Sequence, residues 1–333
     1  MRPFKFSRAE EAERAIRAVK ENPQAKFIAG GTNLLDLMKE GVELPNELID
    51  ITKLPFTQIK TLPNGNLSIG ALARNSDTAN HPLVRQKYPI LTQAILSGAS
   101  PQIRNMATNG GNLMQRTRCP YFYDLSMPCN KRNPGSGCAA MEGLNRTHAI
   151  LGWSEKCVAV YPGDMAVALT ALDASIKVLS ASGKEKSVKI EDFYRLPEQN
   201  PEKDNNLDHG DLITSIEIPK NNFSNRSFYL KLRDRASYAF ALVSVAAAIE
   251  INNEKITDVR IALGGVAHKP WRAKTAEQFL IGKKPTEENF RLASEAELKN
   301  AKPLKHNKFK IEMAKRAIVR TLVLSLNSKQ AQI

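Results

Sequence analysis

Apolar residues recur along the chain at helical spacing in some segments and in short buried runs in others. Near the N-terminus, Ser7 and Glu10 form a capping-box pattern, in which each side chain can satisfy a backbone N–H of a helix's first turn. The apolar residues that follow have helical spacing, at Ala12, Ile16 and Val19. The sequence therefore predicts a helix soon after Ser7.

The remaining apolar pattern predicts a chain of mixed α and β structure. Strands are expected at 26–29, 48–51, 67–70, 175–179, 215–218, 228–232 and 259–263. Helices are expected at 33–39, 84–96, 164–172, 274–280 and 307–326. The apolar segment 237–249 is compatible with either a buried helix or a buried strand. We divide this pattern into three units, at 1–55, 56–225 and 226–333.

Two glycine-rich turns are candidates for binding phosphate. The segment 30–32 is Gly-Gly-Thr after a buried strand, and the segment 108–112 is Thr-Asn-Gly-Gly-Asn. Glycine allows the backbone to take positive φ and to approach a ligand closely, and a following helix start offers free N–H groups. Neither turn matches the dinucleotide fingerprint or the P-loop, so both could also be ordinary loops. Asp164 follows Tyr-Pro-Gly and could bind a ribityl or ribose hydroxyl, or simply cap a helix.

Composition excludes several classes of protein. The chain has 333 residues, of which 42% are hydrophobic and 25% charged, as in soluble globular proteins. No apolar run approaches the roughly 18 residues that a membrane span needs, so no membrane segment is expected. The first residues carry charge but no apolar stretch, so we expect no secretory signal. The net charge of +14 is spread along the chain without a Lys/Arg block, and a nucleic-acid partner is not expected.

The cysteines point to one shared site. All of them lie within 39 residues, at Cys119, Cys129, Cys138 and Cys157. They fall in a stretch, 116–157, that is rich in Pro, Gly and Arg and lacks apolar periodicity, which predicts a long loop. Four thiolates suit an iron–sulfur cluster or tetrahedral zinc, but the spacing has neither zinc knuckles nor a common ferredoxin pattern. The spacing alone therefore leaves three interpretations open: an iron–sulfur cluster, a zinc site or free thiols. A metal site would gain from the neighbouring cations Arg116, Arg118, Lys131 and Arg132.

Three segments resemble a known family. Residues 27–34, 107–112 and 231–241 are similar to the FAD-binding medium subunits of molybdenum hydroxylases, the xanthine dehydrogenase and carbon monoxide dehydrogenase family. The cysteine segments 119–124 and 128–139 resemble, more specifically, the medium subunits of bacterial periplasmic aldehyde oxidoreductases, which carry an extra [4Fe-4S] cluster.

The resemblance implies an α+β fold. We expect a two-subdomain, vanillyl-alcohol-oxidase-like (PCMH-type) FAD-binding domain, followed by a C-terminal α/β CO-dehydrogenase-flavoprotein-like domain. Residues 1–55 would be the first FAD-binding subdomain. Residues 56–225 would be the second, with the cluster loop 116–157 inserted, and residues 226–333 would be the C-terminal domain.

The resemblance also implies site residues. The FAD diphosphate would be wrapped by Lys26, Phe27, Ile28, Ala29, Gly30, Gly31, Thr32, Asn33 and Leu34. The second phosphate-side loop would contribute Thr108, Gly111 and Asn112. Asp164 would bind the ribityl chain, the backbone of Ile213 would contact the isoalloxazine, and Lys231 would lie near that ring. The four cysteines would hold the [4Fe-4S] cluster, and no catalytic residue is expected in this chain.

The implied function is electron transfer within an aldehyde oxidoreductase. A large molybdenum-cofactor subunit and a small [2Fe-2S] subunit would complete a heterotrimer, and FAD would pass electrons to an external acceptor. The complex would be periplasmic by co-export with a signal-bearing partner, or cytoplasmic. Two alternatives are a zinc-stabilised, non-enzymatic binding protein with a basic surface, and an FAD oxidase that acts alone.

Overall fold

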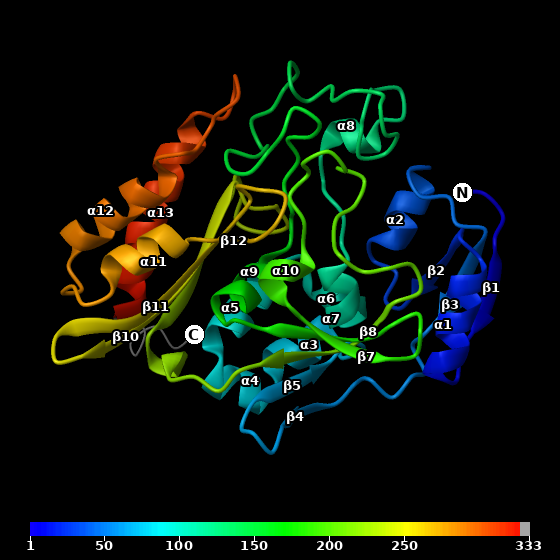
Figure 1. The fold of residues 1–333 in the computed structure, drawn as a ribbon, viewed down its shortest axis with the longest axis horizontal. Coiled ribbons are helices and arrows are strands. Elements are labelled where there is room, and N and C mark those ends of the chain that lie inside the picture. The colour runs from blue at the N-terminus through cyan, green and yellow to red at the C-terminus, as the bar shows by residue number, and fades with distance from the viewer. Residues whose placement is uncertain (327–333) are drawn as a thin grey trace.

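The computed structural model describes residues 1–326, which form three β-sheets with helices packed against them (Figure 1). The first sheet contains β1 (Lys5–Arg8), β2 (Ala25–Ile28) and β3 (Glu47–Asp50). The second contains β4 (Ile59–Thr61), β5 (Leu67–Gly70), β6 (Ser175–Leu179), β7 (Glu185–Lys189) and β8 (Leu212–Ile218). The third contains β9 (Ser227–Leu232), β10 (Val243–Asn252), β11 (Lys255–Gly264) and β12 (Trp271–Arg272). The last part of the expected C-terminal unit, 327–333, lies outside the described residues.

The first sheet is parallel, in the order β1-β3-β2, and it corrects one expectation. Ser7 lies inside β1, opposite Ile49 of β3. Helix α1 (Ala12–Glu21) begins later, and its N-cap residue Glu11 makes no side-chain cap. The predicted capping box is therefore wrong, because pairing with β3 occupies the backbone that the box would have capped. The expected helical stripe itself is confirmed, since Ile16 and Val19 are buried.

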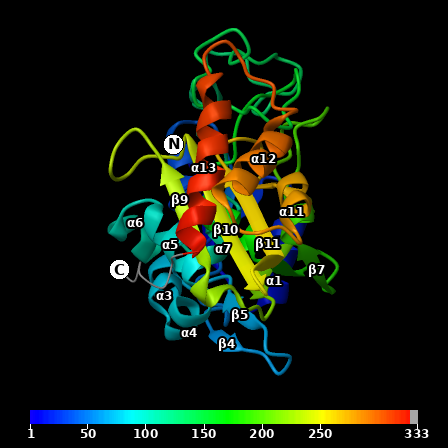
Figure 2. The same cartoon turned by 90° about the vertical axis from the view of Figure 1, so that its left-hand side faces the viewer.

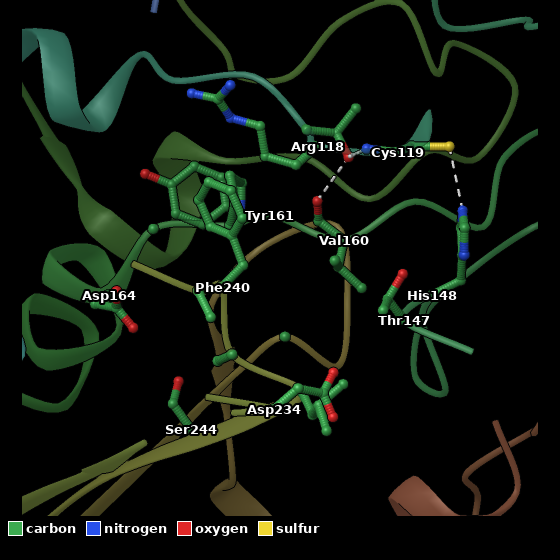
Figure 3. A pocket seen from close by; sticks show the side chains of 17 residues that line it. Arg118, Cys119, Thr147, His148, Val160, Tyr161, Asp164, Asp234, Phe240 and Ser244 are labelled. Atoms are coloured by element: carbon green, nitrogen blue, oxygen red, sulfur yellow. Dashed lines mark hydrogen bonds between the residues drawn. The ribbon is translucent and has the colours of Figure 1, made fainter. Parts of the chain in front are cut away.

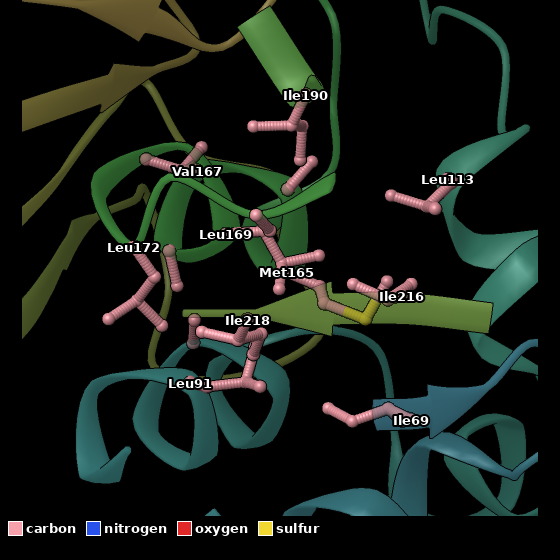
Figure 4. Packing of buried hydrophobic residues seen from close by; sticks show 14 of the residues in the cluster. Ile69, Leu91, Leu113, Met165, Val167, Leu169, Leu172, Ile190, Ile216 and Ile218 are labelled. Atoms are coloured by element: carbon pink, nitrogen blue, oxygen red, sulfur yellow. The ribbon is translucent and has the colours of Figure 1, made fainter. Parts of the chain in front are cut away.

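The second sheet is antiparallel, in the order β4-β5-β8-β6-β7. The helices of this part of the chain are α3 (Asn75–Asn80), α4 (Pro82–Lys87), α5 (Pro89–Ser97), α6 (Pro101–Met106), α7 (Asn109–Leu113), α9 (Asp164–Ala171) and α10 (Ile190–Phe193). Every residue of α9 is buried. Figure 4 shows Met165 and Leu169 of α9 packed with Ile216 and Ile218 of β8. This core fixes α9, and therefore the position of Asp164 at its first turn.

The third sheet is antiparallel, in the order β12-β11-β10-β9, and is covered on both faces. Helices α11 (Lys274–Leu280), α12 (Glu287–Leu298) and α13 (Phe309–Leu326) cover one face, and α5 and α9 contact the other (Figures 1 and 2). Along β10, Val245 and Ala247 face the C-terminal core, whereas Ala246 belongs to the core around α9. A strand buried on both faces is apolar throughout, which is why its sequence could not be distinguished from that of a buried helix.

Residues 116–157, here called the cysteine loop, contain the short helix α8 (Pro120–Tyr123) and are otherwise irregular, as expected. The loop lies between α2 (Leu34–Lys39) and the third sheet (Figure 1). Phe122 of α8 is fully buried and packs with Leu37 of α2 and with Cys129. The loop therefore rests on the helix that directly follows the first glycine turn.

Candidate functional site

In the described part of the chain, two adjoining cavities meet at the first glycine turn. The first has a volume of about 560 Å³ and is lined by residues from 25–34, 108–116 and 202–213. The second has a volume of about 320 Å³ and is lined by residues from 94–115, 162–165 and 231–240. Thr32, Asn33 and Gly111 line both cavities. Together they offer room for one elongated ligand.

All fifteen residues expected to bind the cofactor line one of these cavities. Residues 26–34, Thr108 and Ile213 line the first, and Asn112, Asp164 and Lys231 line the second. They come from β2, α2, α7, α9, β8 and β9 and from the turns beside them, so the fold gathers segments that are far apart in sequence. Their contact with a cofactor stays a prediction, which the proposal below takes up.

The first glycine turn has a steric reason for its composition. A Cβ on Gly30 would lie 2.1 Å from the carbonyl oxygen of Met106, closer than any side chain can tolerate. Gly31 has a φ of 69°, in the left-handed region that favours glycine. The two glycines allow the turn to lie directly against the end of α6.

Asn33 joins the glycine turn to the cysteine loop and keeps one donor free. Its Oδ1 accepts a hydrogen bond of 3.0 Å from the backbone N–H of Arg116. Its Nδ2 is buried without a hydrogen-bond partner among the described residues. An unpaired buried donor costs about 1–3 kcal/mol, so this amide suits an acceptor-rich ligand, such as a diphosphate, where the cavities meet.

The second loop is held by its own polar contacts. Thr108 caps α7, because its Oγ1 accepts a hydrogen bond from the N–H of Gly111. The side chain of Asn112 donates to Asn75 Oδ1 at 2.9 Å. Asn109 is fully buried and donates to Thr78 Oγ1 at 2.7 Å, so it orders the loop from behind.

Asp164 and Lys231 form a buried ion pair in the wall of the second cavity. Lys231 Nζ lies 2.8 Å from Asp164 Oδ2, and the two side chains are 8% exposed for Asp164 and 4% for Lys231. Tyr229 donates its hydroxyl to Asp164 Oδ1 at 2.6 Å. Burial, together with the nearby Asp164 carboxylate, raises the pKa of Tyr229 well above its usual value, so this hydroxyl keeps its proton. The pair thus presents both an acceptor and a cation to the cavity.

Sequence reasoning missed part of the cavity wall. Residues 195–211, here called the strap, connect α10 to β8, and several of them line the first cavity. Glu43 and Arg116 also line it. Their ionic contacts join residues distant in sequence, which leave no periodic signal.

A strained loop borders the second cavity. Tyr238 has a φ of 50°, which is unusual for a bulky side chain. Its neighbour Phe240 is 49% exposed and lies under the guanidinium of Arg118, 5.3 Å from the ring centre. Both aromatic residues line the second cavity. Strain of this kind concentrates at functional sites.

The four cysteines are free thiols, and three of them lie near one another. Cys129 and Cys138 face each other in an isolated antiparallel bridge. Cys157 donates a hydrogen bond to Cys138. Cys119 Sγ lies 3.1 Å from Nε2 of His148 (Figure 3). Within residues 1–326, no group of three or more His, Cys, Asp or Glu side chains is arranged to hold a metal ion.

The surroundings of the sulfur atoms shift the pKa values of the thiols in different directions. The hydrogen bond from Cys157 lowers the pKa of Cys138 to about 6, and backbone N–H groups of Ala140 and Met141 also act on that sulfur. Burial raises the pKa of Cys119 to about 12, although the N–H groups of the following turn oppose this shift. N–H groups directed at sulfur are among the features that tune iron–sulfur clusters. Burial and the hydrogen bond to Cys138 raise the pKa of Cys157, so the surroundings favour a thiolate at Cys138 and oppose one at Cys119 and Cys157.

The cations of the loop have partners other than the sulfur atoms. Arg118 Nη1 lies 2.6 Å from Asp36 Oδ2 of α2. Arg132 donates to the carbonyl oxygens of Tyr121 and Phe122. Arg116 and Lys131 both bind Asp204 of the strap. The positive charges expected to balance an anionic metal site thus also fasten the loop to its neighbours.

A third cavity, of about 240 Å³, lies between the cysteine loop and the second cavity (Figure 3). Cys119 and His148 line it, and Asp164 and Phe240 line both this cavity and the second. Burial and the nearby charge of Lys310 lower the pKa of His148 to about 4, so the imidazole is neutral at pH 7. The cysteine site and the second cavity are therefore adjacent.

Comparison with known proteins identifies the family. Residues 2–221 match the family described as FAD binding domain in molybdopterin dehydrogenase, and residues 228–324 match the CO dehydrogenase flavoprotein C-terminal domain. The chain belongs to the FAD-binding medium subunits of the molybdenum hydroxylases. It is thus an FAD-binding electron-transfer subunit of an oxidoreductase, as its resemblance implied.

Individual relatives support this assignment. The chain is 47% identical to the aldehyde oxidoreductase FAD-binding subunit PaoB of Escherichia coli (strain K12), over 97% of this chain and 98% of that protein. It is 32% identical to the glyceraldehyde dehydrogenase medium chain of Sulfolobus acidocaldarius, over 84% of this chain and 82% of that protein. A carbon monoxide dehydrogenase structure from Hydrogenophaga pseudoflava matches with a TM-score of 0.77 and 22% identity, covering 98% of each chain, and supports the fold.

Family membership settles two further points. The expected FAD-binding and CO-dehydrogenase-flavoprotein-like domains are confirmed, and a non-enzymatic binding protein is excluded.

None of the helices within residues 1–326 is long and apolar enough to cross a membrane.

Proposed function

We propose that this chain is the FAD- and [4Fe-4S]-containing subunit of a molybdenum-dependent aldehyde oxidoreductase. It would accept electrons from the molybdenum centre and iron–sulfur clusters of its partners and pass them through FAD to an external acceptor. The observation that carries the proposal is the placement of all fifteen expected flavin residues around two joined cavities. The 47% identity to an aldehyde oxidoreductase subunit supports aldehydes as the substrates of the complex.

The chain's own residues would orient the flavin along the cavities. The first glycine turn and the free Nδ2 of Asn33 would bind the diphosphate at the junction. Asp164 would accept a hydrogen bond from a hydroxyl of the ribityl chain, and Lys231 would place its charge beside the ring system. When bound, the flavin supplies the exchange between one-electron and two-electron transfer.

Cys119, Cys129, Cys138 and Cys157 would hold the [4Fe-4S] cluster. Their confinement to one irregular loop, the N–H groups around their sulfur atoms and the similarity of the loop to the aldehyde oxidoreductase subunits support this assignment. Zinc in the same position is the competing assignment, because it uses the same four ligands.

The remaining parts of the proposal concern assembly. We infer a heterotrimer with a large molybdenum-cofactor subunit and a small [2Fe-2S] subunit, because relatives are named as medium chains or FAD-binding subunits. We also infer either periplasmic location, by co-export with a signal-bearing partner, or cytoplasmic location. The unit boundaries at residues 55 and 225 belong to the proposal as well.

The test uses the full chain purified without oxygen, alone and with its partner subunits. We expect bound FAD, a broad brown absorbance beyond the flavin bands and about four iron atoms per chain. Zinc at about one per chain without iron would refute the cluster but not the flavin. Aldehyde oxidation should require the partner subunits. Turnover by the isolated chain would instead favour an oxidase that acts alone.

A further inference from the structure

A chain of five alternating charges connects the cysteine loop to the first cavity. Lys131 Nζ lies 2.6 Å from Asp204 Oδ1, and Asp204 Oδ2 lies 2.7 Å from Arg116 Nε. Arg116 Nη1 lies 2.7 Å from Glu43 Oε1, and Glu43 Oε2 lies 2.6 Å from Lys26 Nζ. Each interior group has two oppositely charged neighbours. This series of ion pairs therefore runs from the cysteine loop to β2, the strand that precedes the first glycine turn.

Most of the side chains in this series of ion pairs are largely buried. The Lys131 side chain is only 2% exposed, and those of Glu43 and Arg116 are 11% and 19% exposed. Burial opposes the charged form of Asp204, but Lys131 and Arg116 outweigh it and lower the pKa of Asp204. Lys26 and Arg116 lower the pKa of Glu43 in the same way. The two carboxylates of the series are therefore charged at neutral pH, and each depends on its cationic neighbours.

The strap is held to the cysteine loop by the ion pairs of Asp204 and by hydrogen bonds, one of which runs from Ser154 Oγ to the carbonyl oxygen of Glu198 at 2.9 Å. Besides its ion pair, Lys131 Nζ donates to the carbonyl oxygen of Pro201 at 2.6 Å. Arg116 Nη2 donates to the carbonyl oxygen of Glu202 at 3.2 Å. Glu202 and Asp204 line the first cavity, whereas Lys131 lies outside its wall. Lys131 therefore makes no direct contact with the cavity, and its contacts to Pro201 and Asp204 connect it to the cavity through the strap.

An apolar contact supports the same connection. Phe122 packs with Leu37 of α2 and with Cys129, and its ring lies under the guanidinium of Arg116 at 4.8 Å. Helix α2 follows the glycine turn directly. A shift of the cysteine loop would therefore disturb the cavity from two sides, at the strap and at the turn.

We propose that Asp204 is a positioning residue that couples the cysteine loop to nucleotide binding in the first cavity. With Lys131 in place, the strap closes the wall around the ligand. Without it, the strap loses its anchor and FAD is held more weakly. Because coupling free energies are reciprocal, FAD should in turn order the cysteine loop. The identity of the ligand rests on the proposed function, but the coupling does not require a metal in the loop.

The decisive variant is Lys131→Met, which keeps an unbranched side chain one atom shorter and removes the charge. In metal-free, flavin-free full-length protein, we expect the Kd for FAD to rise about tenfold, within the usual range of coupling between sites. Lys131→Arg should restore most of the affinity, because a cation returns. Lys156→Met removes an exposed lysine of the same loop and should leave the Kd unchanged.

Two measurements separate coupling from general loss of structure. In a double-mutant cycle, the effects of Asp204→Asn and Lys131→Met should be less than additive, because the double variant loses the contact between the two residues only once. In hydrogen exchange, FAD should slow exchange at 128–138 in the wild type and not in Lys131→Met. A Kd within twofold of wild type in Lys131→Met would overturn the proposal, as would fully additive effects. If the purified wild type lacks iron, the cluster assignment fails, but this test is unaffected.

Discussion

Gly30→Ala should weaken flavin binding although it adds only one methyl group. The new Cβ would lie 2.1 Å from the Met106 carbonyl oxygen, so the glycine turn and the end of α6 must separate by about 1 Å. Overpacking of this kind costs about 1–3 kcal/mol. In the empty protein the turn can relax outward. A bound ligand requires the glycine turn and the end of α6 to keep their positions. Most of the free-energy cost therefore appears in the complex with FAD rather than in the empty protein.

If about 2 kcal/mol falls on the complex, the Kd for FAD rises about 30-fold. The assay is titration of flavin-free protein with FAD, followed by quenching of flavin fluorescence. Gly183→Ala is the matched control, because Gly183 has a φ of 80° and a methyl group added there would meet no atom within 4 Å. The control should cost about 1 kcal/mol of stability and leave the Kd unchanged. A Gly30→Ala protein that binds FAD within twofold of wild type would refute the steric argument.

Four further changes test other parts of the site. Gly31→Val should abolish FAD binding, because a branched residue disfavours the φ of 69°, and retention of stoichiometric flavin would contradict this. Lys231→Met should lower the reduction potential of the bound flavin in a spectroelectrochemical titration, because Asp164 loses its compensating cation. Cys129→Ala should lose iron and expose residues 116–157 to protease, whereas unchanged iron would argue against the cluster. Lys310→Met should lower the melting temperature, because Lys310 donates to the backbone carbonyl oxygens of Thr147, His148 and Gly265. Burial lowers the pKa of Lys310 to about 7, so between about pH 7 and 10.4 the unfolded chain holds a proton that the folded chain lacks. The wild type therefore gains stability as pH rises through this window, and the loss in Lys310→Met should be larger at pH 9 than at pH 6.

Local patterns in the sequence predict most of the regular elements. The expected strand at 175–179 and helix at 274–280 match β6 and α11, because one apolar face of each is buried in the expected way. The capping box fails at Ser7, where a long-range strand pairing overrides a local preference. Helix α12 is not among the elements that the apolar pattern predicts.

The cavity walls could be predicted only in part. The residue pattern marked the glycine turns and Asp164, and the resemblance added Lys231, but neither showed that Asp164 and Lys231 form an ion pair. The strap carried no signal, because its role depends on a contact between Asp204 and residues more than 70 positions away. Such pairings are set by the packing of whole units, which single-sequence patterns do not encode.

The charges around the cysteine loop explain how a segment with few apolar contacts keeps its shape. Its apolar contacts, around Phe122 and where Ile150 and Leu151 join the C-terminal core, are few for a segment of some forty residues. The buried ion chain adds order only while every member is present, since a lone buried charge costs more than its pair returns. A thiolate-bound metal would add a second set of cross-links within the loop, at residues that include Cys129 and Cys138. The ion pairs therefore connect the loop to the flavin cavity, and in our proposal the cluster cross-links the loop itself. Loss of the ion pairs should weaken the binding of the cluster, and loss of the cluster should weaken the ion pairs.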